Sequence, residues 1–144
     1  MKSSNYSGSR TEADVNPAQA ALAQRLAEDV VDCDPSILSL IVVDELGRVL
    51  SVSRSSRLPE SEKVPPELVR AFGTIAKAII GAANNAAPAM GRTEAIVGIF
   101  KNQKVLLINL QEYNLLLALR LSRSANAEYV GDKIGDLLAT RIEP

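Results

Sequence analysis

Hydrophobic and polar positions along the chain predict three helices and five strands. Apolar residues recur at helical spacing over 17–32, 66–87 and 126–142. Runs rich in apolar and β-branched residues predict strands at 36–43, 48–54, 93–101, 103–110 and 114–122. The expected order is α-β-β-α-β-β-β-α, and the short connections between strands imply an antiparallel sheet. Because several strands are apolar on both faces, we expect helices on both sides, in an α+β sandwich.

The predicted long helix carries two apolar stripes instead of one. The first is bulky and contains Leu68, Phe72, Ile75, Ile79, Ala82 and Ala86. The second is small and contains Val69, Gly73, Ala76, Ile80, Ala83 and Ala87. The two stripes lie about 100° apart around the helix. Bulky side chains suit packing on a sheet, whereas small ones let another backbone approach closely.

Two explanations of the second stripe compete. In one, the helix is embedded between its own sheet and another helix of the same chain. In the other, the small stripe meets the same stripe of a second copy across a two-fold axis, so that helix packs on helix. The second explanation predicts a homodimer.

Charge and composition exclude several classes of function. The net charge is −1, from 16 basic and 17 acidic side chains, which argues against nucleic-acid binding. The chain has no histidine, and Cys33 is its one cysteine, so neither a Ser-His-Asp triad nor a Cys-His pair can form. No apolar run approaches the ~20 residues of a membrane span. We expect a soluble protein without a cofactor or metal, and not an enzyme.

The remaining charged residues suggest no clear chemistry. An acidic cluster ends the first helix and comprises Glu28, Asp29, Asp32 and Asp34. Solvated surface, a basic partner and a metal are its possible roles, although the spacing fits no calcium loop. Asp44 and Glu45 fit a turn better than a catalytic carboxylate pair.

The stretch SILSLIVVDELGRVLSVSR, followed by one long helix, three strands and VGDKIGDLL, resembles the roadblock family. The resemblance covers about residues 18–140. It implies a five-stranded antiparallel sheet with the long helix on one face and the terminal helices on the other. It also implies dimerisation through the long helix and the strand after it, here Thr93–Lys101. Family members act as platforms for Ras-like small GTPases or as subunits of motor and signalling assemblies.

Together, the stripe and the resemblance predict a dimer interface. Its residues are Val69, Gly73, Ala76, Ile80, Ala83, Ala87, Ala95, Val97 and Ile99. The implied function is a non-catalytic, cytoplasmic scaffold or regulator whose partners are a second copy and a small GTPase. The chain has no G-x-x-x-x-G-K-[ST] phosphate loop of its own. An arginine supplied to a partner's phosphates is conceivable for Arg48, Arg54, Arg57 and Arg92.

The alternative is a ligand-sensing domain of the PAS type, because IVVDELGRVLSVS also resembles the opening hairpin of those domains. PAS domains usually place several short helices between the second and third strands, where this sequence predicts one long helix. In either case residues 1–15 are polar and predict a disordered tail, and 16–144 predict a single domain.

Overall fold

A five-stranded antiparallel sheet forms the centre of the structure, a computed structural model that describes residues 16–58 and 64–141. The strand order is β2-β1-β5-β4-β3. The strands are β1 (Ile37–Asp44), β2 (Val49–Arg54), β3 (Ala95–Ile99), β4 (Gln103–Leu110) and β5 (Leu115–Ser122). The N-terminal hairpin and the C-terminal three-stranded meander meet where β1 pairs with β5, and β2 and β3 form the two edges.

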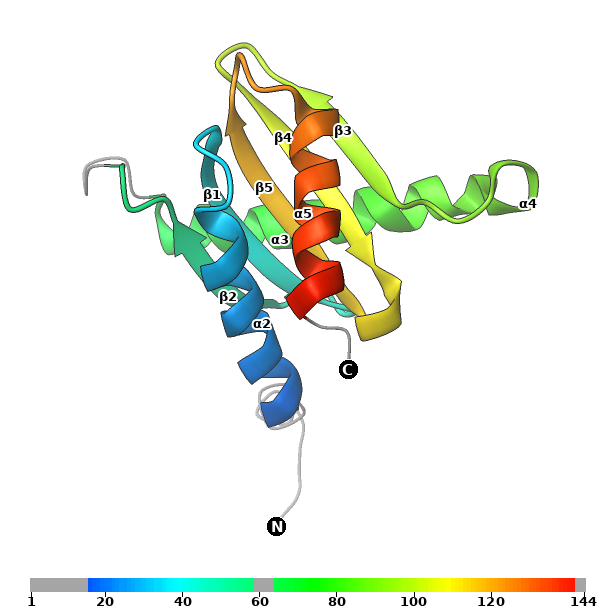
Figure 1. The fold of residues 1–144 in the computed structure, drawn as a ribbon. Helices are drawn as coiled ribbons and strands as arrows, with labels where there is room; N and C mark the ends of the chain where they lie inside the picture. The colour runs from blue at the N-terminus through cyan, green and yellow to red at the C-terminus, as the bar shows by residue number, and fades with distance from the viewer. Residues whose placement is uncertain (1–15, 59–63, 142–144) are drawn as a thin grey trace.

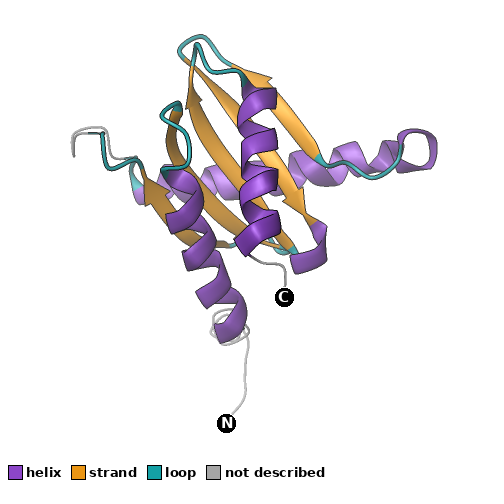
Figure 2. Ribbon diagram, viewed as in Figure 1, coloured by secondary structure: helices purple, strands orange, loops and turns teal. Residues whose placement is uncertain are grey.

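The helices cover both faces of this sheet (Figures 1 and 2). They are α2 (Pro17–Val31), α3 (Pro66–Ala83), α4 (Ala87–Met90) and α5 (Ala127–Arg141), with short 3-10 helices η2 (Asn84–Ala86) and η3 (Gln111–Tyr113). Helices α2 and α5 lie side by side on one face, and α3 crosses the other face behind the sheet. Among the described residues, the sheet therefore has the two helices α2 and α5 on one side and the long helix α3 on the other.

The central strands are buried on both faces because each face has its own core. Leu40 and Val42 of β1 pack under α2 and α5, while Ile41 and Val43 pack toward α3. In β5, Leu117 and Leu119 belong to the first core. This alternation explains why β1 and β5 read as continuous apolar runs in the sequence.

The predicted helix over 66–87 is interrupted near its end. Regular α-helix stops at Ala83, three residues adopt 3-10 geometry, and α4 follows with Pro88 in its first turn. A proline ring clashes with the carbonyl four residues earlier, here that of Asn84, so the α-helical ladder cannot continue through this point. Gly91, at φ +84°, ends α4 in a conformation that favours glycine.

The sandwich predicted from the sequence is confirmed, with five antiparallel strands and the long helix alone on its face. Asn16 caps the start of α2, and its side chain accepts a hydrogen bond from the amide of Ala18 at 2.8 Å. The predicted tail over 1–15 lies outside the described residues. Within the described segments, no helix has the length and hydropathy to cross a bilayer.

Candidate functional site: an apolar surface on α3 and β3

Helix α3 turns its small stripe toward the sheet, and not its bulky one. Ala76 is fully buried, Ile80 is 3% exposed, and both belong to the core between α3 and the sheet. Gly73 is also buried. The prediction that the bulky stripe covers the sheet is therefore wrong, and the two stripes have exchanged their expected places.

A close contact at Gly73 explains this orientation. A Cβ atom at Gly73 would lie 2.9 Å from Cγ2 of Val49 and 3.3 Å from the backbone oxygen of Gly47. Only a glycine lets α3 approach the β1–β2 hairpin this closely. The small residues do mark a close approach, as the sequence suggested, but the neighbour is the sheet of the same chain.

The bulky stripe is left on the surface of α3. Leu68 is 59% exposed, Ile75 54% and Ile79 42%, and only Phe72 of its large side chains packs partly against the core. A monomeric protein rarely exposes such a row of large apolar side chains along one helix. The stripe is a candidate contact surface.

The nearby edge strand β3 is also apolar and open. Its sequence is AIVGI, with no charged residue, and Val97 and Ile99 are exposed. The opposite edge strand, β2, contains Ser51 and Ser53 and ends at Arg54. Unpaired edges without charges invite pairing with another chain. The register of β3 with β4 pairs Val97 with Leu106, a residue of the core under α2 and α5, so Val97 and Ile99 point away from α3. What β3 offers beside α3 is its open backbone edge. We call Leu68, Ile75 and Ile79 together with this edge the α3–β3 surface.

The residues predicted for a dimer interface divide into two groups. Gly73, Ala76 and Ile80 are covered by the sheet of their own chain, and Val69 packs against the same core. The other five are half-buried or exposed, namely Ala83, Ala87, Ala95, Val97 and Ile99. Contact of this second group with another copy stays a prediction. The exposed bulky stripe was missed because periodicity shows that a helix has two faces but not which one meets the sheet.

A groove lies beside the N-terminal half of α3, on the same face of the sheet. Its volume is about 1130 Å³. Apolar side chains line it from all of β1, β2, α3, β4 and β5 and from the β3–β4 turn, and they include Val52, Leu68, Phe72, Phe100, Val105 and Ala118. Its other lining residues include four cations, Arg54, Arg70, Lys101 and Arg120. The groove occupies the part of the sheet that α3 does not cover.

The other end of the helical segment projects away from the sheet. In Figure 1, the end of α3 and all of α4 extend past β3. Met90, the last residue of α4, is 82% exposed. The side chain of Asn84 accepts a hydrogen bond from the amide of Thr93 at 3.0 Å, which ties the returning chain to the start of this segment. We call residues 84–90 the overhang.

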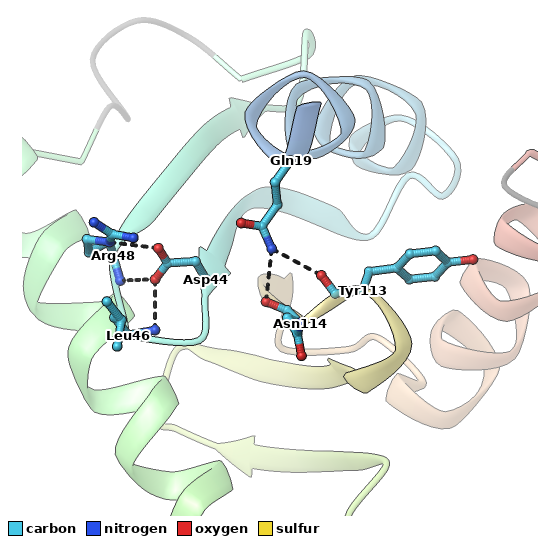
Figure 3. A network of polar contacts seen from close by, with 6 residues as sticks. All are labelled: Gln19, Asp44, Leu46, Arg48, Tyr113 and Asn114. Atoms are coloured by element: carbon cyan, nitrogen blue, oxygen red, sulfur yellow. Dashed lines mark hydrogen bonds and ion pairs between the residues drawn. The ribbon is translucent and has the colours of Figure 1, made fainter. Parts of the chain in front are cut away.

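A polar network fixes the turn between β1 and β2 (Figure 3). The buried Asp44 carboxylate accepts from the amides of Leu46 and Arg48, each at 2.9 Å, and forms an ion pair with Arg48 Nε at 2.7 Å. Nearby, the Gln19 side chain donates to the backbone oxygen of Tyr113 at 3.1 Å and so ties α2 to the β4–β5 turn. The turn interpretation of Asp44 is confirmed, and this carboxylate has a structural role.

The acidic cluster at the end of α2 is split by the fold. Asp34 is buried and accepts from the Ser36 amide at 3.0 Å and from Lys133 Nζ at 2.9 Å. Hydrogen bonding from Ser36 and then from Lys133 outweighs desolvation and lowers the pKa of Asp34 to about 2. Burial raises the pKa of the neighbouring Cys33 thiol. The described part of the chain contains no acid or cysteine group arranged to hold a metal ion.

The lowered pKa of Asp34 predicts a loss of stability in acid. A depressed folded-state pKa contributes stability above the unfolded value, near 3.8, and that contribution disappears as pH falls toward 2. We expect Asp34→Asn to cost on the order of 1 kcal/mol at pH 6, allowing for screening by water. Urea unfolding of both proteins at intervals from pH 6 to pH 2 should show the gap between them closing. The exposed Asp136→Asn control should show no such gap, and a gap for Asp34→Asn that persists at pH 2 would contradict the assignment.

Three of the four arginines considered for a partner's phosphates make contacts within this chain. Arg48 pairs with Asp44, Arg54 donates to the Leu58 carbonyl oxygen, and Arg57 donates to that of Asp34. Arg92 is exposed. These contacts give no support to an arginine aimed at a partner's active site.

Comparison with known proteins identifies the fold. No protein-family model matches the sequence, and no curated protein matches it. Solved structures do match. A Roadblock/LC7 domain from Streptomyces avermitilis has a TM-score of 0.64 and 17% identity, covering 81% of this chain and 92% of its own. The gliding protein MglB from Thermus thermophilus has a TM-score of 0.66 and 18% identity, covering 88% and 92%.

A second MglB structure, described as having a tetrameric arrangement, has a TM-score of 0.66 and 19% identity, covering 88% of this chain and 91% of that one. At these identities the likeness concerns the fold. The resemblance to roadblock domains that the sequence suggested is confirmed at that level. Most of the connection between β2 and β3 is the long helix α3, continued by the short η2 and α4, and this agrees with the roadblock resemblance, because the PAS alternative would place several short helices there.

Proposed function

We propose that the protein is a non-catalytic homodimer that presents a platform to a Ras-like small GTPase or a related cytoplasmic assembly. The observation that carries the proposal is the α3–β3 surface. A bulky helix stripe and an uncharged edge strand lie next to each other and have no cover from their own chain. Nothing within the described part of one copy compensates for their exposure to water.

A two-fold axis through β3 would cover both parts at once. Two β3 strands related by this axis run antiparallel, so their free amide and carbonyl groups can pair into a continuous sheet. The same axis places the two α3 helices on one face of that sheet, where Ile75 and Ile79 of one copy can meet those of the other. The contact is self-complementary, as a two-fold interface requires.

The role as a platform rests on the roadblock likeness of the fold and on the character of the surface. One of the fold neighbours, an MglB, is described as having a tetrameric arrangement, so self-association occurs on this fold. The sequence contains no phosphate loop, so a nucleotide requirement would belong to the partner. The dimer would present every exposed surface of the chain twice, with the two copies held in a fixed orientation to each other.

Solution mass and nucleotide-dependent capture test the proposal together. We expect light scattering to give twice the chain mass of 15.4 kDa at micromolar concentration. A tagged protein should retain, from native lysate, a protein with a G-x-x-x-x-G-K-[ST] loop, in amounts that differ between GTP-analogue and GDP conditions. A 15.4 kDa particle at every concentration rules out the dimer. A dimer that retains no nucleotide-dependent partner rules out the platform for a GTPase.

A further inference from the structure

Two features on the α3 face of the sheet are open to solvent in a single copy. One is the groove, an apolar hollow of about 1130 Å³ beside the start of α3. The other is the overhang, which leaves the sheet beyond β3 and ends in the exposed Met90. They lie at opposite ends of the same helical segment, so one copy cannot join them.

We propose that the overhang of each copy fills the groove of the other, with Met90 as the anchoring side chain. The inference rests on the proposed homodimer and adds to it a specific contact, that of the overhang with the groove of the other copy, which we call the seat. The groove would then be a socket that the second copy completes, and each dimer would contain two such sockets.

The reach of the overhang agrees with this seat. A two-fold axis perpendicular to the sheet at β3 keeps both α3 helices on one face and points each overhang under the neighbouring sheet. Residues 84–90 span about 10 Å at 1.5 Å per helical residue. Strands lie about 4.8 Å apart, so this length passes roughly two strands. Counted from the edge these are β3 and β4, and Val105 of β4 lines the groove.

The chemistry of the overhang and of the groove also fits this contact. Residues 84–90 read NNAAPAM and include no charged side chain, so no charge would enter an apolar groove. Methionine is unbranched and adapts to irregular apolar hollows. The cations Arg70 and Lys101 are exposed in a single copy and can stay in water at the rim while their apolar stems contact the incoming segment.

The exposure of Met90 makes the proposal easy to test. A side chain that is 82% exposed contributes little to the fold of its own chain, so its effect on dimer affinity must come from the other copy. We expect Met90→Asp to weaken dimerisation at least about tenfold, measured by sedimentation over a concentration series. Met90→Leu, the matched apolar control, should stay within about threefold. At concentrations where all three proteins are monomeric, Met90→Asp, Met90→Leu and the unaltered protein should unfold at the same temperature.

Cross-linking then locates the seat. In a Cys33→Ser background, a Met90→Cys copy is mixed with a Val105→Cys copy and treated with a short bis-maleimide. We expect a cross-linked pair of chains, and none when Val105→Cys is replaced by Glu128→Cys on the opposite face. A dimer that is insensitive to Met90→Asp, or that links Met90 no better to Val105 than to Glu128, overturns the seat alone. A protein that is monomeric at every concentration overturns the dimer as well.

Discussion

A glutamate at position 75 should convert the dimer into a folded monomer. Ile75 lies in the middle of the bulky stripe, so the substitution places an unpaired carboxylate in the proposed contact surface of each copy. Burying an unpaired charge costs about 3–5 kcal/mol. We expect the dissociation constant to rise by at least two orders of magnitude. Light scattering should give a mass near 15.4 kDa at concentrations where the unaltered protein is twice as heavy.

The exposure of Ile75 separates this effect from unfolding. More than half of the side chain is in water in one copy, so Ile75→Glu should change the stability of the monomer by about 0.5 kcal/mol or less. Thr74→Glu is the matched control, because Thr74 is an exposed neighbour on the same helical turn outside the bulky stripe. Its mass should not change. Equal dimer affinity in both variants would show that the bulky stripe is not the contact surface.

The identity of the exposed stripe is the point at which sequence reasoning failed. Helical spacing identified two apolar faces on α3, and alternation identified strands with two buried faces, because both are properties of neighbouring residues. Which face of α3 meets the sheet depends on the distance between α3 and the β1–β2 hairpin. That distance is set by the contact of Gly73 with Val49 and Gly47, residues more than 20 positions away. Spacing along the chain carries no information about it.

Sequence patterns were sufficient to predict local structure where the interacting residues are close together in the chain. Asp44 and Glu45 predicted a turn, and the Asp44 carboxylate does accept from two amides within the next four residues. The helical spacing predicted an end of the long helix at residue 87, and α3 does give way to 3-10 geometry just before it. By contrast, Asp34 looked like one acid of a surface cluster. Its bond to Lys133, almost 100 residues away, separates it from that cluster and could not be predicted from spacing.

A leucine at position 73 should have the largest effect on stability of any single change in α3. The Cβ atom alone would already lie 2.9 Å from Val49 Cγ2, and the Gly47 backbone oxygen at 3.3 Å blocks an easy shift. Val49 is β-branched and short, so it cannot swing away as a long side chain would. Helix α3 must therefore lift from the sheet and uncover Ala76 and Ile80. We expect a loss of about 3 kcal/mol or more in urea unfolding.

Gly81 provides the matched control on the same helix. A Cβ atom there meets nothing within 4 Å, and the position is exposed. Gly81→Leu should therefore stabilise the protein by up to about 1 kcal/mol, the ordinary gain on replacing a helical glycine. Gly73→Ala should fall between the two leucine variants and keeps the comparison measurable if Gly73→Leu does not fold. Because all three substitutions gain nearly the same helix propensity, their differences report packing against the hairpin. If Gly73→Leu and Gly81→Leu change the free energy of unfolding alike, α3 does not pack on the sheet through its small stripe. The bulky stripe would then not be the exposed one.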